Sequence, residues 1–185
     1  MMYLRGFLPW IVLAVVSSFA GQGTAMAAAL VTCLLVLAAR GRATRTDLLG
    51  LATLGYFAVM TAVAFAAPHA IPDSWTGPLS IGVLGLVSWV SLAVRQPFTL
   101  HFARQQTSSE FWNHPVFYRI NAVITAVWAA SFTLTAIAYA AAEAVASRPT
   151  ALEIVLEVAG FAIPALFTAR YPQHARARLT TDAKA

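Results

Sequence analysis

The sequence predicts an all-α fold: a polytopic integral membrane helical bundle with about six transmembrane helices. The composition is 59% hydrophobic and only 10% charged, whereas charged residues make up about 25% of an ordinary soluble domain. The apolar residues also gather into runs that each approach the ~20 residues a helix needs to cross hydrocarbon. Because the chain has only 185 residues, we expect a single transmembrane domain over residues 1–185. The predicted spans are 2–20, 21–39, 47–67, 75–94, 121–142 and 151–169.

The basic residues alternate between the gaps that separate these runs. All twelve Lys and Arg residues except Arg148 fall at the N-terminus, after the second run, after the fourth run or in the C-terminal tail. Because Lys and Arg are enriched on the cytoplasmic side of membrane proteins, this pattern predicts cytoplasmic N- and C-termini. The lipid bilayer is therefore the first expected partner. The net charge of +5 needs no nucleic-acid partner to explain it.

The first run, residues 2–20, is open to three interpretations. Arg5 precedes an apolar stretch that ends in Ser18-Phe19-Ala20, as in a secretory signal peptide. Pro9 and Trp10 within that stretch, and the Gly-Gln-Gly turn that follows it, count against cleavage. The strongly apolar part is also short enough to form a helix that does not fully cross, which would leave five full spans. A full span, a short helix and a cleaved signal all remain open.

The next two spans, 21–39 and 47–67, are joined by a basic turn, and small residues mark the faces on which helices can pack. Gly21, Ala25 and Ala29 recur every four residues on the second run. Lipid is as apolar as leucine, so helix association in a membrane depends on such close packing. The pattern does not distinguish packing within one chain from packing between copies, and a homo-oligomer stays open.

The connection between the fourth and fifth spans, residues 95–120, is predicted to be an interfacial amphipathic segment. Its aromatic side chains would lie at headgroup level while its Arg and Gln side chains face water. Thr107 and Glu110 have capping-box spacing for a short helix, which Pro115 would end or bend. Anchoring of the neighbouring helices and docking of a partner are both open. The expected headgroup-level residues are Phe98, Leu100, Phe102, Phe111, Trp112, Phe117 and Tyr118, and the candidate interaction surface is Arg104, Phe111, Trp112 and Arg119.

Two carboxylates on the last span are the candidate ion or proton site. Glu153 and Glu157 lie one helical turn apart, and Glu157 falls inside the span 151–169. An acid at a helix centre costs about 2.5 to 3.5 kcal/mol on insertion, so its presence there suggests a function. Placement near the outer interface is the structural alternative. Pro164 removes a backbone donor and can expose a carbonyl oxygen to a partner or an ion.

No catalytic chemistry is visible in the sequence. It contains no Gly-rich phosphate loop and no HExxH, GxSxG or CxxC motif. Cys33 is the single cysteine, so neither an intramolecular disulfide nor a multi-cysteine metal site can form. Transmembrane haem needs histidines inside facing helices, whereas the four histidines fall at or beyond span ends: His69, His101, His114 and His174. We therefore expect no enzyme activity, no catalytic residues, no metal site and no cofactor.

The order of elements resembles the bacterial intracellular septation protein A family of small inner-membrane proteins. The resemblance runs from Phe7-Leu8-Pro9 through the basic turn at 40–45 and the loop ending near Trp75. Its most specific part is the passage from Phe117 to Asn121 before the helix that contains Trp128. The connecting stretch is richer in aromatic residues than the family's basic segment. The resemblance implies a bacterial inner membrane, a role in septation and no catalytic residues.

We therefore expect an inner-membrane protein of cell-envelope maintenance that acts through contacts with envelope-synthesis or division proteins. The alternative is a small transporter or proton-coupled protein that uses Glu157 and Glu153.

Overall fold

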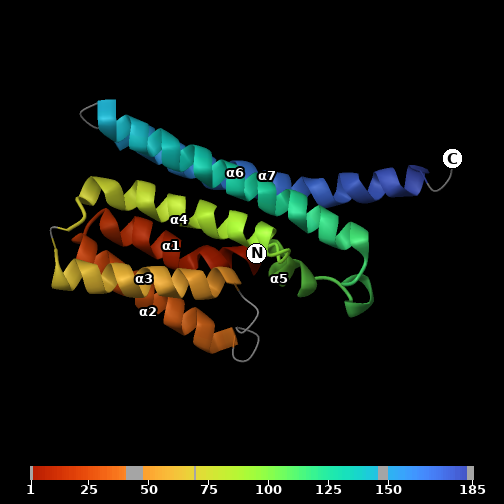
Figure 1. Ribbon diagram of the computed structural model, residues 1–185, viewed down its shortest axis with the longest axis horizontal. Helices are drawn as coiled ribbons and strands as arrows, with labels where there is room; N and C mark the ends of the chain where they lie inside the picture. The colour runs from red at the N-terminus through yellow and green to blue at the C-terminus, as the bar shows by residue number, and fades with distance from the viewer. Residues whose placement is uncertain (1, 41–47, 69, 146–149, 183–185) are drawn as a thin grey trace. The chain divides into compact units, whose positions relative to one another are not determined.

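The structure is a computed structural model that describes residues 2–40, 48–68, 70–145 and 150–182. Within these ranges, the side chains of residues 2–5, 40, 73, 143, 145, 150–154, 157 and 173–182 lie outside the description. The described chain consists of helices and their connections, without a strand, which confirms the predicted all-α fold (Figure 1). The elements are α1 (Met2–Ser17), α2 (Gln22–Arg40), α3 (Leu48–Ala66), α4 (Asp73–Ala93), α5 (Thr99–Arg104), the 3₁₀ turn η2 (Ser109–Phe111), α6 (Pro115–Val145) and α7 (Thr150–Asp182).

Four of these helices are long and apolar enough to cross a membrane. They contain the segments Gln22–Ala39, Leu48–Ala66, Ser74–Ala93 and Pro115–Ala142, which match the second to fifth predicted spans. The fifth begins six residues earlier than predicted, because residues 115–120 form the first turns of α6. The first run gives a shorter apolar helical segment, Gly6–Ser17. The sixth predicted span, residues 151–169, lies on α7. The side chains of its first four residues are outside the description, so this span stays a prediction.

Many large apolar side chains are exposed on the helices, while several hydroxyl side chains are buried within the apolar core. Leu35 and Leu134 are 66% and 67% exposed, while Ser88 and Thr125 are completely buried. Hydrocarbon offers no hydrogen bonds, so polar groups in a bilayer need partners inside the protein. The outward leucines and inward hydroxyls therefore indicate that lipid surrounds these helices.

The chain forms two compact units, Met1–Thr76 and Gly77–Ala185. In unit 1, α2 packs against both α1 and α3. Trp10 lies in the core of this unit, where its indole N–H donates to the Thr53 hydroxyl (3.2 Å). Its ring stacks on Tyr56 at 5.1 Å between centroids and contacts Phe57 at 4.8 Å. α1 is thus part of the packing of unit 1, while the expectation of one domain over the whole chain stays a prediction.

In unit 2, α5 and α7 both pack against α6. Trp128 on α6 is the centre of the core, with ring contacts to Phe98, Phe132 and Phe161 at centroid distances of 6.4, 5.3 and 6.2 Å. Its indole N–H donates to the Thr168 hydroxyl on α7 (2.9 Å). α6 therefore organises this unit and fixes where the connection after α4 can lie.

Candidate functional site

The connection between α4 and α6 starts with a tightly hydrogen-bonded turn. Arg95 has a left-handed backbone, with φ of 56°, and its N–H donates to the carbonyl oxygen of Leu92 (3.0 Å). The next N–H, that of Gln96, donates to the carbonyl oxygen of Ser91 (2.8 Å). These two bonds make a Schellman motif, in which glycine usually occupies the left-handed position. Arginine takes that position here and the chain leaves α4 in a fixed direction.

The buried hydroxyl of Ser91 then directs the chain into α5. Its oxygen accepts a hydrogen bond from the Phe98 N–H (3.2 Å) and donates one to the carbonyl oxygen of Ser88 (2.7 Å). Both bonds are made away from solvent, since Ser91 is fully buried. Ser91 thus supplies the partner that a buried backbone N–H at the entrance to α5 requires.

A second buried group of hydroxyls attaches α5 to α6. The Thr99 hydroxyl donates to the main-chain oxygen of Asn121 (3.0 Å) and lies 2.8 Å from the Thr125 hydroxyl. The Asn121 side-chain amide donates to the Phe117 carbonyl oxygen (2.8 Å). One consistent arrangement satisfies every hydroxyl, with Thr125 donating to Thr99. The first part of the connection is therefore held to the core by paired polar groups.

The segment predicted to be interfacial is divided into two parts that differ in exposure. Its first part, residues 97–102, is called here the inner half, and Phe98, Leu100 and Phe102 are only 4%, 8% and 1% exposed. The three side chains are therefore buried in the protein and do not face the lipid headgroups as expected, and the Phe98 ring lies against Trp128 on α6. The second part, residues 103–120, is called here the tip, and its exposed side chains include Arg104, Phe111, Trp112, Tyr118 and Arg119.

The tip has a defined local structure around Trp112. The indole N–H donates to the main-chain oxygen of Thr107 (2.9 Å), and the Arg104 guanidinium lies over the indole ring, 5.5 Å from its centroid. This cation–π contact is worth about 0.5 to 1 kcal/mol at an exposed site. Phe111 is the neighbour of Trp112 in the chain and is 51% exposed. The structure thus brings Arg104, Phe111 and Trp112 to one place.

Arg119, the fourth predicted interaction residue, lies on the second turn of α6. Its side chain is exposed, and no hydrogen bond or ring contact seen in the described residues joins it to the other three. The local start of α6 also differs from the expectation. Pro115 is the first residue of α6, and the His114 ring nitrogen accepts the Val116 N–H (3.2 Å), so Pro115 begins a helix instead of ending one.

The predicted capping box at Thr107 and Glu110 is not observed. The short helix exists as the 3₁₀ turn Ser109–Phe111, but its cap residue is Ser108 and no side chain there makes a capping hydrogen bond. The main-chain oxygen of Thr107 instead accepts the indole bond from Trp112. The tip is therefore shaped by an aromatic side chain, a role that the Thr-x-x-Glu spacing does not reveal.

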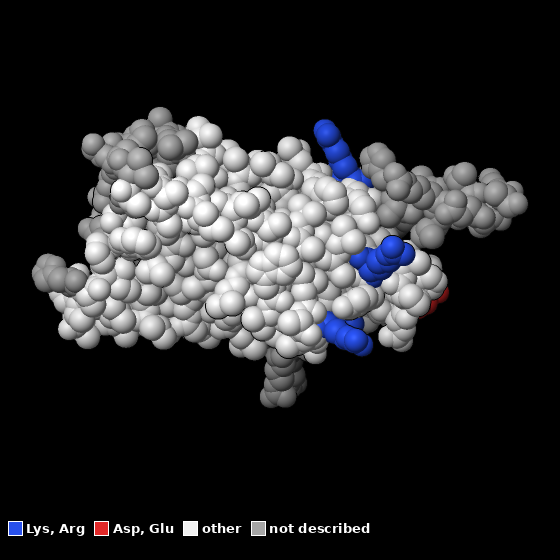
Figure 2. Space-filling view, turned by 45° about the horizontal axis from the view of Figure 1, so that its top comes forward, with Lys and Arg blue, Asp and Glu red and all other residues white. Residues whose placement is uncertain are grey.

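The described side chains of the tip carry a net positive charge. Among the described side chains, every arginine belongs to unit 2, and Glu110 is the one described carboxylate. Figure 2 shows the blue basic side chains near one end of the visible face, with a red acidic side chain beside them. The basic side chains described by the structure are Arg95, Arg104, Arg119 and Arg170. Arg104 and Arg119 belong to the tip itself, against the single described carboxylate Glu110. The tip therefore offers aromatic surface with a net positive charge among its described side chains, which favours an acidic partner.

The candidate acids Glu153 and Glu157 lie on α7, but their side chains fall outside the described residues. Their role stays a prediction. The structure does show what becomes of the carbonyl that Pro164 releases: Gly160 loses its helical donor, and the Ser131 hydroxyl on α6 donates to its oxygen instead (2.9 Å). A Cβ at Gly160 would lie 2.6 Å from the Thr135 hydroxyl oxygen. The Gly160 carbonyl oxygen is therefore paired with Ser131 and contributes to the packing of α7 on α6.

Tryptophan–threonine pairs recur between helices and were not anticipated from the sequence. Trp89 on α4 donates to the Thr133 hydroxyl on α6 (3.1 Å), in the same way as the pairs at Trp10 and Trp128. The paired hydroxyls of Thr133 and Thr168 each donate to a carbonyl oxygen four residues earlier on their own helix. The sequence signal for these pairs is a tryptophan inside an apolar run, because an indole N–H surrounded by lipid needs an acceptor within the protein. The acceptor itself, some forty residues away, leaves no local pattern.

Within the described residues, no three His, Cys, Asp or Glu side chains gather in a way that could hold a metal ion. Cys33 is buried and makes no disulfide. Comparison of the chain with protein-family models, with curated proteins and with solved structures gives no match.

Proposed function

We propose that this chain is a membrane-embedded contact protein of the bacterial cell envelope, and that the tip is the surface on which it binds a partner protein. The carrying observation is the exposed arrangement of Arg104 over Trp112 beside Phe111. Trp, Tyr and Arg are the residue types most enriched where binding energy concentrates in protein interfaces. The tip combines all three.

The inner half supports partner binding over simple membrane anchoring. An anchoring segment needs an apolar face that enters the lipid. Phe98, Leu100 and Phe102 would supply most of that face, but they are buried against the protein. The aromatic side chains that remain outside are Phe111, Trp112 and Tyr118, at 51%, 37% and 37% exposure. Most of the apolar face that an anchor needs is therefore unavailable to lipid.

The rigidity of the tip supports the same proposal. Trp112 is fixed by its bond to Thr107 and by the Arg104 guanidinium, so few rotamers are lost when a partner binds. Ordering a long side chain at an interface costs about 0.5 to 1.5 kcal/mol. A surface that is already ordered keeps more of its contact energy as affinity.

The chemistry of the partner follows from the charge and from the resemblance in layout. The arginines favour an acidic surface, and the resemblance to the septation protein family suggests a division or wall-synthesis protein of the inner membrane. This assignment places the tip on the cytoplasmic side, as the basic gap after the fourth span predicts. No catalytic step, metal or cofactor is part of the proposal.

The test is capture of partners by the full-length tagged chain at native abundance, after crosslinking in cells. Charge reversal at Arg104 and Arg119 together should remove a division or wall-synthesis protein from the captured set. The matched control is Arg170→Glu, which reverses an exposed arginine on α7 and should leave capture unchanged. Equal capture by the native chain and the double variant, at equal membrane abundance, would refute the site.

A further inference from the structure

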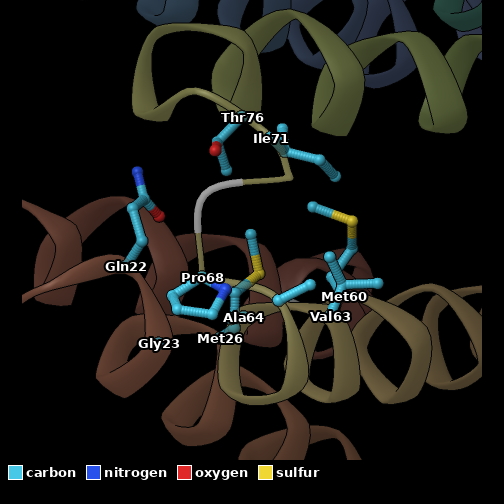
Figure 3. Close-up of a pocket in the computed structure, with 10 residues that line it drawn as sticks. Gln22, Gly23, Met26, Met60, Val63, Ala64, Pro68, Ile71 and Thr76 are labelled. Atoms are coloured by element: carbon cyan, nitrogen blue, oxygen red, sulfur yellow. The ribbon is translucent and has the colours of Figure 1, made fainter.

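Unit 1 contains a cavity of about 200 Å³ where α2 begins and α3 ends. Its lining residues all belong to unit 1. Figure 3 shows side chains from both helices and from the start of α4 around this space. Its walls are mainly apolar and include Gln22, Met26, Met60, Val63 and Thr76.

One polar atom in the wall lacks a partner. The side-chain oxygen of Gln22 is buried and accepts no hydrogen bond from any described residue. A buried acceptor without a donor destabilises the folded chain, because it has lost its hydrogen bond to water. Thr76, whose side chain is 6% exposed, lines the same cavity (Figure 3). The cavity therefore presents a hydrogen-bond acceptor to a ligand that can donate.

The remainder of the wall restricts the ligand to a neutral, apolar body. None of the ten lining residues is charged, so an ionised ligand would lose its hydration without gaining a counter-charge. Met26 and Met60 contribute flexible, polarisable thioethers that adapt to irregular apolar shapes. A cavity near 150 Å³ holds benzene, so this one has room for about eight non-hydrogen atoms by the same scaling.

We propose that unit 1 binds the hydroxyl end of a neutral amphiphile, with the hydroxyl donating to the Gln22 side-chain oxygen and the alkyl chain lying against Met26, Met60 and Val63. A free alkanol and a hydroxyl of a neutral glycerolipid offer this same chemistry. An ether of equal size lacks the donor and would leave the Gln22 oxygen unpaired.

The experiment is photolabelling of the full chain in phosphatidylcholine nanodiscs with a diazirine-bearing 1-heptanol, followed by peptide mapping. We expect adducts at Met26 and Met60. Unlabelled 1-heptanol should compete about twofold to thirteenfold better than 1-methoxyhexane, which has the same number of heavy atoms, since one hydrogen bond contributes about 0.5 to 1.5 kcal/mol. Competition by a monoacylglycerol at a lower membrane fraction than heptanol would identify a lipid source, and the reverse order a free alcohol.

Two variants locate the hydrogen bond. Gln22→Leu should make the alcohol and the ether compete equally, whereas Gln106→Leu, an exposed glutamine of unit 2, should preserve the difference. Equal competition by alcohol and ether in the native chain would overturn the proposal, and this result does not depend on the folding of any variant. Absence of adducts in the cavity, or labelling spread over lipid-facing side chains such as Leu35 and Val59 without competition, would also overturn it.

Discussion

The inner half and the tip are neighbours in one connection and both carry aromatic side chains, yet those of the inner half are buried and most of those of the tip are exposed. Phe102 is 1% exposed and Phe111 is 51% exposed. The difference arises from backbone hydrogen bonds: Ser91 and Thr99 attach the inner half to α4 and α6, while the bonds of the tip close on the tip itself. Aromatic content therefore does not predict whether such a segment packs against the protein. The positions of small buried hydroxyl side chains do predict it.

The largest expected effect separates the two phenylalanines. Phe102→Ala should lower the free energy of unfolding by about 3 to 5 kcal/mol, because it removes a buried ring and leaves a cavity. Phe111→Ala should change it by less than about 0.5 kcal/mol, as is usual for exposed positions. Reversible unfolding by SDS in mixed micelles measures both. Similar losses for the two variants would show that Phe111 is also packed and that the division between the halves is wrong.

The hydroxyl of Ser91 should account for the next largest effect. Ser91→Ala leaves the buried Phe98 N–H without its acceptor and should cost about 1 to 3 kcal/mol in the same unfolding measurement. Ser109→Ala is the control, since this exposed residue begins the 3₁₀ turn. If Ser91→Ala were as mild as the control, the direction in which the chain enters α5 would need another explanation.

The turn at Arg95 should respond in the opposite direction. A non-glycine residue in the left-handed region is disfavoured by about 1 to 2 kcal/mol, so Arg95→Gly should stabilise the chain, less the added entropy of a glycine in the unfolded state. We expect a net gain of about 0.5 to 1 kcal/mol. Gln96→Gly, one residue further on, should give no gain. A destabilised Arg95→Gly chain would mean that the arginine side chain makes a compensating contact.

The smallest effect is expected at the cation–π contact. Arg104→Gln removes the charge above Trp112 and should weaken the tip by about 0.5 to 1 kcal/mol, without changing global unfolding. Faster hydrogen exchange of the Trp112 indole N–H, which is bonded to the Thr107 oxygen, reports this local loosening. Exchange of the Trp128 indole should stay unchanged, because its partner lies on α7. Unaltered exchange at Trp112 would show that the Thr107 bond alone orders the tip.

The sequence predicted the helices of this protein better than their contacts. Apolar runs of membrane-spanning length are a local signal, so α2, α3, α4 and α6 lie close to their predicted ranges. The start of α6 was misplaced because Pro115 can end one helix or begin another, and the His114 cap that decides between them is a side-chain conformation. Residues 97–102 were predicted to be interfacial from their aromatic side chains. Their burial depends on packing against another helix, and sequence periodicity does not identify that helix.

At the candidate site, the sequence predicted the residue types but not their arrangement. The candidate interaction residues were chosen by side-chain type, as aromatic or basic. The position of the Arg104 guanidinium over the Trp112 ring depends on the 3₁₀ turn that lies between them in the chain. Near Pro164, the released carbonyl was predicted, but its partner Ser131 lies 29 residues away in the chain. Such pairings follow from packing of α6 on α7 and have no local pattern.

The most direct test of the central claim is photo-crosslinking from the tip in living cells. A benzoyl-phenylalanine at position 111 of the full chain, at native abundance, should give an adduct with a division or wall-synthesis protein. The same residue at position 134, a lipid-facing leucine of α6 that is 67% exposed, should not give that adduct. If both positions gave the same pattern, or position 111 reacted with lipid alone, the tip would be a membrane contact and the proposed function would be contradicted.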